Sequence, residues 1–210
     1  MKHVPHIYVK DWGHKVLDVA PEQQRHVTRV LRTVAGDPIS YTNGEGLLGS
    51  GIWDGTSVVR GDEEMVARPS ELVVAVAPPA NKDRLRFTVE KLAELGVERL
   101  VWLETKWGGR RVPPVEKQSA WAISALEQSR GAWLMWLGDD LVGWSDLEQP
   151  IVVCQPGGES LVELTRTVVI GPEGGFDPGE IPPGTSEISL GPTVLRVETA
   201  AVAAAIKFRP

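Results

Sequence analysis

The stretch Glu71-Leu-Val-Val-Ala-Val-Ala77 is a continuous apolar run. Such a run is typical of a strand buried on both faces, as in a parallel sheet. Residues 81–96 follow with helical spacing, and Asn81 is suited to cap that helix while Gly96 ends it. The apolar stripe of this predicted helix consists of Leu85, Val89, Leu92 and Leu95.

The same alternation of strand and helix continues downstream. The residues predict strands at Leu100–Leu103, Ile151–Cys154, Thr167–Ile170 and Glu187–Leu190, and helices at Pro114–Arg130 and Glu198–Phe208. Strands that alternate with helices favour a parallel sheet covered by helices on both faces. We therefore predict an α/β domain over residues 70–210.

Upstream, residues 1–69 have short strand patterns instead. Strands are predicted at Pro5–Val9, Ile39–Thr42, Gly51–Trp53 and Val58–Arg60, and Asn43-Gly-Glu-Gly46 reads as a hairpin turn. One helix is expected over Glu22–Val34, because Val27, Val30, Leu31 and Val34 recur at helical spacing. A small β-rich segment with one helix suggests a compact barrel, so we place a domain boundary near residue 70.

Composition narrows the class of protein. The chain has 210 residues, with 22 Lys and Arg against 28 Asp and Glu, so its formal charge is 22 − 28 = −6. An apolar fraction of 42% argues against intrinsic disorder. A single cysteine, Cys154, excludes an intramolecular disulfide framework and a Cys-rich zinc site. Without a signal sequence or a membrane-length apolar run, we expect a cytoplasmic protein with neither a membrane nor a metal partner.

Two glycine-proline turns follow two of the predicted buried strands. They are Ile170-Gly-Pro-Glu-Gly-Gly-Phe176 and Leu190-Gly-Pro-Thr-Val-Leu-Arg-Val-Glu-Thr-Ala200. Ligands of parallel α/β sheets bind beyond the carboxyl ends of the strands, and glycine lets the backbone approach them closely. Neither turn matches a dinucleotide fingerprint or a P-loop. The residues alone predict a ligand-binding domain and leave its ligand open.

Local basic clusters suggest a second partner, although the chain is acidic overall. One cluster has the spacing of a single helix face, and the other is a basic-aromatic loop after a predicted strand. Arginine side chains bind phosphate groups, and aromatic side chains stack on unpaired bases. The two clusters together therefore favour RNA binding. The candidate RNA-binding residues are Arg25, His26, Arg29, Arg32, Lys106, Arg110 and Arg111.

The two glycine-proline turns resemble the paired cofactor motifs of the RsmE family, bacterial methyltransferases that act on N3 of a uridine in 16S ribosomal RNA. Three further stretches resemble the family in the same order: His26-Val-Thr-Arg-Val-Leu-Arg32, Lys91-Leu-Ala-Glu-Leu-Gly-Val97 and Glu127-Gln-Ser129. The resemblance spans nearly the whole chain.

This resemblance implies a PUA-like RNA-binding β-barrel over residues 1–69 and a SPOUT methyltransferase domain with a deep trefoil knot over 70–210. It also implies a homodimer, S-adenosyl-L-methionine as cofactor, and small-subunit ribosomal RNA, free or assembled, as substrate. The implied cofactor-binding residues are Ile170, Gly171, Pro172, Gly174, Leu190, Gly191, Val194, Leu195 and Thr199.

Methylation of uracil N3 requires loss of the imide proton and alignment of the nitrogen with the methyl carbon. Among residues at motif positions, a carboxylate of Glu173 or Glu198 is suited to relay the proton, and Arg196 to stabilise the uracil oxyanion. Glu198 is alternatively a helix cap. Two other interpretations stay open: a related knotted methyltransferase for another RNA or for ribose, and a non-catalytic RNA-binding relative.

Overall fold

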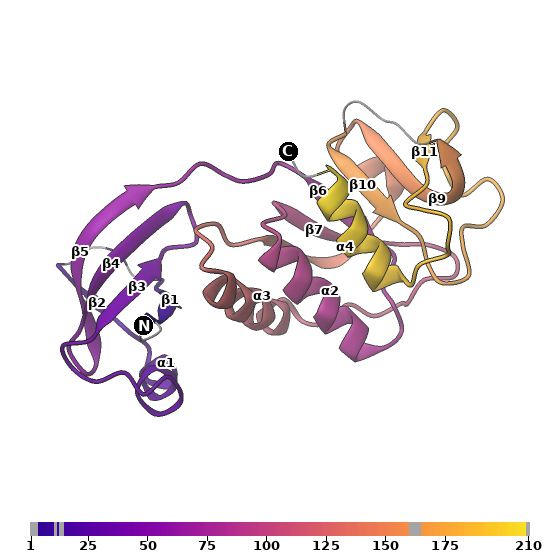
Figure 1. Cartoon of the computed structure of the whole chain (residues 1–210). Coiled ribbons are helices and arrows are strands. Elements are labelled where there is room, and N and C mark those ends of the chain that lie inside the picture. Colours follow the sequence, from indigo (N-terminus) through magenta and orange to yellow (C-terminus); the bar gives the residue numbers. More distant parts are fainter. Residues whose placement is uncertain (1–3, 11, 13–14, 160–164, 209–210) are drawn as a thin grey trace. The chain divides into compact units, whose positions relative to one another are not determined.

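The computed structural model describes residues 4–10, 12, 15–159 and 165–208. The chain divides into two compact units (Figure 1). Unit 1 comprises Met1–Arg68 together with Leu126–Leu134, and unit 2 comprises Pro69–Ala125 together with Met135–Pro210. The sequence analysis placed residues 126–134 with the second domain, whereas the structure groups them with unit 1.

Unit 1 is built on a curled five-stranded sheet in the order β1-β3-β4-β5-β2. β1 runs parallel to β3, and the other pairs are antiparallel. Asn43 fixes the β3–β4 turn, because its Oδ1 accepts hydrogen bonds from the backbone N–H groups of Glu45 and Leu47 at 2.8 and 3.1 Å. The strands are β1 (His6–Tyr8), β2 (Val16–Asp18), β3 (Pro38–Thr42), β4 (Leu47–Trp53) and β5 (Ser57–Met65).

The helix of unit 1 is shorter than its apolar spacing predicts. It consists of α1 (Pro21–Arg25) and a π-helical turn, η1 (His26–Val30). Only Val27 of the expected stripe is buried, whereas Val30 and Val34 are 64% and 61% exposed. Arg32 adopts a left-handed φ of 55°. The prediction of one helix over Glu22–Val34 with a core-facing stripe is therefore wrong.

Unit 2 contains a six-stranded sheet in the order β11-β9-β10-β6-β7-β8, with every adjacent pair parallel. The predicted parallel α/β arrangement is thus present. β8 was missed, because charged residues interrupt its apolar run, and β9 and β11 differ in extent from the predicted strands. The strands are β6 (Val73–Val76), β7 (Arg99–Leu103), β8 (Trp136–Val142), β9 (Ile151–Glu159), β10 (Thr167–Ile170) and β11 (Ser186–Ile188).

The helices of unit 2 are α2 (Lys82–Glu94), α3 (Val115–Ser129) and α4 (Val197–Phe208). The end of α3 falls within the segment grouped with unit 1. α2 begins as expected: Asn81 Oδ1 accepts from the N–H groups of Asp83 and Arg84 at 2.8 and 3.3 Å. Gly96 follows its end with a φ of 71°. Three residues of the predicted apolar stripe, Leu85, Val89 and Leu92, are buried.

The two faces of the sheet are covered differently. α4 packs on β6 and β10 and contacts α2 (Figure 1). On the same face, Trp102 donates a hydrogen bond to Gln118 of α3 at 2.9 Å. The other face, which includes Ala75, packs against Trp144 of the 3-10 helix η2 (Trp144–Asp146) and against Phe176 and Ile181. The α-helices therefore do not cover both faces as predicted, since a 3-10 turn and a loop cover the second.

Within the described residues, no helix is long and apolar enough to cross a membrane. That part of the chain also contains no group of three or more His, Cys, Asp or Glu side chains placed to hold a metal ion.

Candidate functional site

The sheet of unit 2 has a topological switch point between β6 and β10. From β6 the chain proceeds to β7 and β8 on one side, whereas β10, β9 and β11 lie on the other. Ligands of open parallel sheets bind beyond the carboxyl ends of the strands at such a point. The segment after β10 is the first glycine-proline turn, and the segment after β6 leads into α2.

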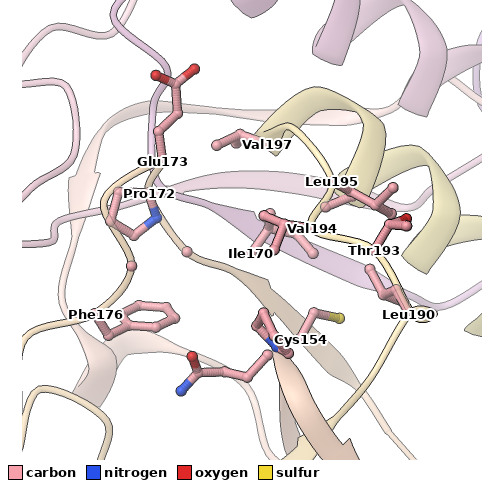
Figure 2. Close-up of a pocket in the computed structure, with 15 residues that line it drawn as sticks. Cys154, Ile170, Pro172, Glu173, Phe176, Leu190, Thr193, Val194, Leu195 and Val197 are labelled. Carbon is pink, nitrogen blue, oxygen red and sulfur yellow. The ribbon is translucent and has the colours of Figure 1, made fainter.

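A pocket, here called the loop pocket, opens at this edge of the sheet (Figure 2). The two glycine-proline turns line it together, with contributions from the middle of β9 and the start of α4. The complete lining is Cys154, Gln155, Pro156, Ile170, Gly171, Pro172, Glu173, Gly175, Phe176, Leu190, Thr193, Val194, Leu195, Val197 and Ala200.

Most of the cofactor-binding residues suggested by the resemblance meet in the loop pocket. Those in its lining are Ile170, Gly171, Pro172, Leu190, Val194 and Leu195, whereas Gly174, Gly191 and Thr199 are outside it. The pocket volume is about 150 Å³, below the ~300–1,000 Å³ of pockets that enclose a whole drug-sized ligand. A larger ligand would therefore lie partly outside it.

Glycine at position 171 is required by close packing. A Cβ atom there would lie 2.6 Å from the ring of Phe176. That ring cannot easily yield, because it packs against Trp144 at a centroid distance of 5.5 Å. Gly191 in the second turn has a φ of 148°, which side chains rarely adopt. The sequence therefore keeps the backbone of both turns accessible to a ligand.

Arg84 connects the pocket rim to α2. Its guanidinium forms an ion pair with Glu173 in the first turn, and its Nε lies 3.6 Å from Glu198 Oε1 on α4. The Glu198 side chain is 11% exposed, and its Oε2 is buried without a hydrogen-bond partner among the described residues. One cation thus holds two carboxylates beside the pocket. In Figure 2 the Glu173 side chain extends away from the apolar side chains of the lining.

The candidate catalytic residues occupy three different environments. Glu173 lines the loop pocket and its side chain is 60% exposed. Glu198 is in the first turn of α4 and faces Arg84 rather than the pocket lining. Arg196 is exposed just before α4, and its carbonyl accepts from the N–H of Ala200 at 2.8 Å. The structure thus gathers the two carboxylates through Arg84 and leaves Arg196 on the surface.

The Cys154 side chain lines the loop pocket. Burial raises the pKa of its thiol to about 12, so the thiol stays protonated near neutral pH. A protonated thiol is a weak nucleophile, and Cys154 therefore acts here as an apolar wall residue.

The candidate RNA-binding residues are all exposed, but they do not form the single helix face expected in unit 1. Arg25 belongs to α1 and Arg29 to the π-helical turn, whereas Arg32 follows both with its left-handed φ. His26 is on the π-helical turn.

In unit 2, two of the basic residues pair with acids. Lys106 Nζ lies 2.8 Å from Asp177 Oδ2, and Arg110 Nη1 lies 3.1 Å from Glu104 Oε1. Arg111 is exposed on the same loop as Arg110.

The sequence analysis did not select Arg84, Phe176 or Cys154. Arg84 carries a usable signal, because it is in the first turn of the helix that follows the central strand β6. Phe176 and Cys154 are ordinary apolar residues within their segments, and only the three-dimensional convergence of β9 and β10 reveals their place in the wall.

Comparisons with known proteins agree with this architecture. The RNA methyltransferase domain family matches residues 67–208. Ribosomal RNA small subunit methyltransferase E of Rickettsia conorii is 27% identical over 168 residues, which are 70% of this chain and 68% of that protein.

Solved structures extend the likeness to nearly the whole chain. A chain described as a probable rRNA-methyltransferase from Porphyromonas gingivalis has 27% identity and a TM-score of 0.83, with 97% of this chain and 96% of that chain covered. Ribosomal RNA small subunit methyltransferase E of Neisseria gonorrhoeae, solved with S-adenosyl methionine, has 21% identity and a TM-score of 0.82, with 98% and 96% covered. Because the family match covers well over half of its residues, this chain belongs to the RNA methyltransferase family, and within that family it resembles small-subunit methyltransferase E.

Proposed function

We propose that the chain is an S-adenosylmethionine-dependent methyltransferase that modifies N3 of one uridine in small-subunit ribosomal RNA. The observation that carries this proposal is the convergence of the two glycine-proline turns on one pocket, with Arg84, Glu173 and Glu198 at its rim. The family membership supports methyl transfer to RNA, and the likeness to methyltransferase E supports the ribosomal substrate.

The residues present fit this cofactor. Ile170, Phe176 and Leu195 provide apolar walls suited to a flat heterocycle, and the glycines leave room for backbone contacts. When bound, S-adenosylmethionine supplies an electrophilic methyl carbon. The residues that would hold it are those of the two turns: Ile170, Gly171, Pro172, Leu190, Val194 and Leu195. Solved neighbours of the same fold hold this cofactor.

The chain must also manage the imide proton of the uracil. Glu173 is the carboxylate that reaches both the pocket lining and solvent, so we assign to it the acceptance of this proton. Arg84 pairs with both Glu173 and Glu198 and so orients the two carboxylates together. The exposed Arg196 is free to approach an incoming base or phosphate, and we assign to it stabilisation of the uracil oxyanion.

The proposal includes the wider architecture implied by the family resemblance. Unit 1 is then a PUA-like barrel that binds RNA through Arg25, His26, Arg29 and Arg32, and its curled sheet supports this. The segment 171–199 is threaded as a trefoil knot, supported by the meeting of its two ends at one pocket. The functional form is a homodimer, with the exposed rim of the pocket available to a second copy.

Transfer of labelled methyl groups tests the proposal. The purified chain is incubated with methyl-labelled S-adenosylmethionine and small ribosomal subunits from a host that lacks the family enzyme. We expect label in the small-subunit RNA, together with a raised melting temperature in the presence of cofactor alone. Cofactor binding without label in the RNA would contradict the ribosomal substrate, and absence of cofactor binding would contradict the enzyme assignment itself.

A further inference from the structure

A second hollow in unit 2, here called the basic pocket, is larger than the loop pocket. Its volume is about 580 Å³, within the ~300–1,000 Å³ typical of ligand sites. The first turn of α2, the loop after β7 and the start of α3 enclose it. The lining is Pro79, Ala80, Lys82, Leu85, Gly109, Arg110, Arg111, Val112, Pro113, Pro114, Lys117 and Trp121.

All the charged side chains in this lining are cationic: Lys82, Arg110, Arg111 and Lys117. Lys82 and Lys117 come from different helices and line the same pocket, and the interaction with Lys82 lowers the pKa of Lys117. Two ammonium groups offer donors only, so they cannot satisfy one another. An anion between them would accept from both and remove their repulsion.

Gly109 determines the position of the loop that carries Arg110 and Arg111. The N–H of Gly109 donates to the carbonyl oxygen of Pro78 at 2.8 Å, and a Cβ at Gly109 would lie 2.7 Å from that same oxygen. The loop can therefore fold against the segment after β6 only without a side chain here. This contact places Arg110 and Arg111 in the same lining as Lys82.

The floor of the basic pocket includes an aromatic ring. Trp121 of α3 is 9% exposed, and Lys117 Nζ lies 5.5 Å from its ring centroid. This contact holds the Lys117 ammonium over the ring by cation–π attraction. The ring, Leu85 and the prolines form the apolar part of the lining, and the lysines and arginines form the cationic part. A nucleotide suits this combination better than a simple inorganic ion, because it has both an apolar base and a charged phosphate.

The two pockets share the first turn of α2. Lys82 and Leu85 line the basic pocket, while Arg84 between them pairs with Glu173 and Glu198 at the loop pocket. The same turn of α2 thus borders both pockets. When the target base of an RNA strand enters the loop pocket, a nucleotide next to it in the strand can therefore enter the basic pocket.

We propose that the basic pocket binds a nucleotide of the RNA strand that flanks the methylated base, with Lys82 and Lys117 gripping its phosphate and Arg110 and Arg111 the next one. This inference rests on the proposed function, because the flanking strand belongs to the same RNA substrate.

The test compares Lys82→Ala/Lys117→Ala with Arg86→Ala/Lys91→Ala. The control pair also removes two cations from unit 2, but Arg86 and Lys91 are exposed on α2 outside the basic pocket. Binding of a transcript of the small-subunit RNA is measured over a range of salt concentrations. Because both lysines contact the same phosphate, the variant loses one phosphate contact with a single strand, and the slope of log K against log salt should fall by about 0.7. Cofactor affinity, measured by calorimetry, should stay unchanged.

We expect the reduced slope, and about tenfold weaker RNA binding, in the pocket variant only. Equal behaviour of the two variants, or failure of the unsubstituted chain to bind the transcript, would overturn the proposal. The measurements distinguish the proposed activity from the proposed RNA contact. If the pocket variant has a reduced salt slope but the unsubstituted chain transfers no methyl group, only the proposed activity is refuted. Methyl transfer with an unchanged slope in the pocket variant would refute the basic pocket alone.

Discussion

At the residue scale, single side chains in each unit hold segments that are distant in sequence. Glu127, part of the Glu-Gln signature, accepts hydrogen bonds from the N–H of Tyr8 at 2.9 Å and from Gln23 Nε2 at 2.7 Å. Arg84 plays the corresponding part in unit 2, where it joins α2 to two segments near the pocket. Loss of either side chain would leave polar groups without their hydrogen-bond or ion-pair partners, which costs most where those groups are buried.

Glu127 makes a testable contribution to pH-dependent stability. Burial raises the pKa of its carboxyl above the ordinary 4.5, against the opposing hydrogen bonds from Tyr8 and Gln23. The contribution of this group is therefore fully present below the unfolded pKa and is lost as pH rises through the folded pKa. Glu127→Gln keeps an acceptor but does not titrate, so its free energy of unfolding relative to the unsubstituted chain should increase between pH 4 and pH 8. Urea unfolding at both pH values measures this, and parallel pH profiles would refute it.

Arg84→Ala should reduce methyl transfer by about tenfold or more, because it removes the cation that orients Glu173 and Glu198. Cofactor affinity should change little, because Arg84 pairs with the two carboxylates and does not line the loop pocket. Arg84→Lys should restore part of the rate, since it keeps the charge but not the planar fork. Arg86→Ala, on the same helix, serves as the control. An unchanged rate of methyl transfer in Arg84→Ala would remove Arg84 from the mechanism.

At the element scale, the loops and helices that surround β6 and β10 determine where a ligand can bind. The sequence predicted β6, α2 and the β3–β4 turn well, because local signals decide each: an apolar run, an Asn cap and an Asn-Gly turn. The prediction of a single helix over residues 22–34 was wrong, because the spacing of apolar residues does not show whether Val30 and Val34 contact a core. The structure leaves both exposed and uses a π-helical turn instead.

The first glycine-proline turn offers a prediction about cofactor binding. Gly171→Ala places a methyl group against Phe176, which Trp144 prevents from moving away. Overpacking of this kind costs about 1–3 kcal/mol, so cofactor Kd should rise by roughly 5–100-fold. Calorimetric titration with S-adenosylmethionine measures the change. Gly138→Ala in β8 is the matched control, because its added methyl meets only ordinary contacts. Equal affinities in both variants would show that this turn does not shape the cofactor site.

At the scale of the whole molecule, the protein has a net negative charge, yet we propose that it binds RNA, which is also negatively charged. Its basic side chains must therefore be grouped at particular places on the surface. The sequence identified several of these cations but not how they are arranged. Lys106 and Arg110 lie in ion pairs, whereas Lys82 and Lys117 come from α2 and α3 and are brought to one pocket only by the fold. Similarly, both pocket turns were visible in the sequence, but Arg84 was not, because its partners are about 90 and 110 residues away in the chain.

RNA binding by unit 1 is tested with Arg25→Ala/Arg32→Ala. Both side chains are exposed, so their removal should leave stability nearly unchanged while lowering RNA affinity and the steepness of its salt dependence by about 0.7 per lost phosphate contact. Filter binding at several salt concentrations, with Arg86→Ala/Lys91→Ala as the charge-matched control, measures the effect. An unaltered salt slope would mean that this surface is only solvated.

The most direct test of the proposed function is to identify the methylated nucleoside. Small-subunit RNA treated with the enzyme and cofactor is digested to nucleosides, and mass spectrometry with sequence mapping assigns the methyl group. We expect N3-methyluridine at one position, lost in the Glu173→Gln variant and reduced in the Arg84→Ala variant. A methyl group on ribose, on another base or on many uridines would contradict the assignment of this pocket to a single uridine N3.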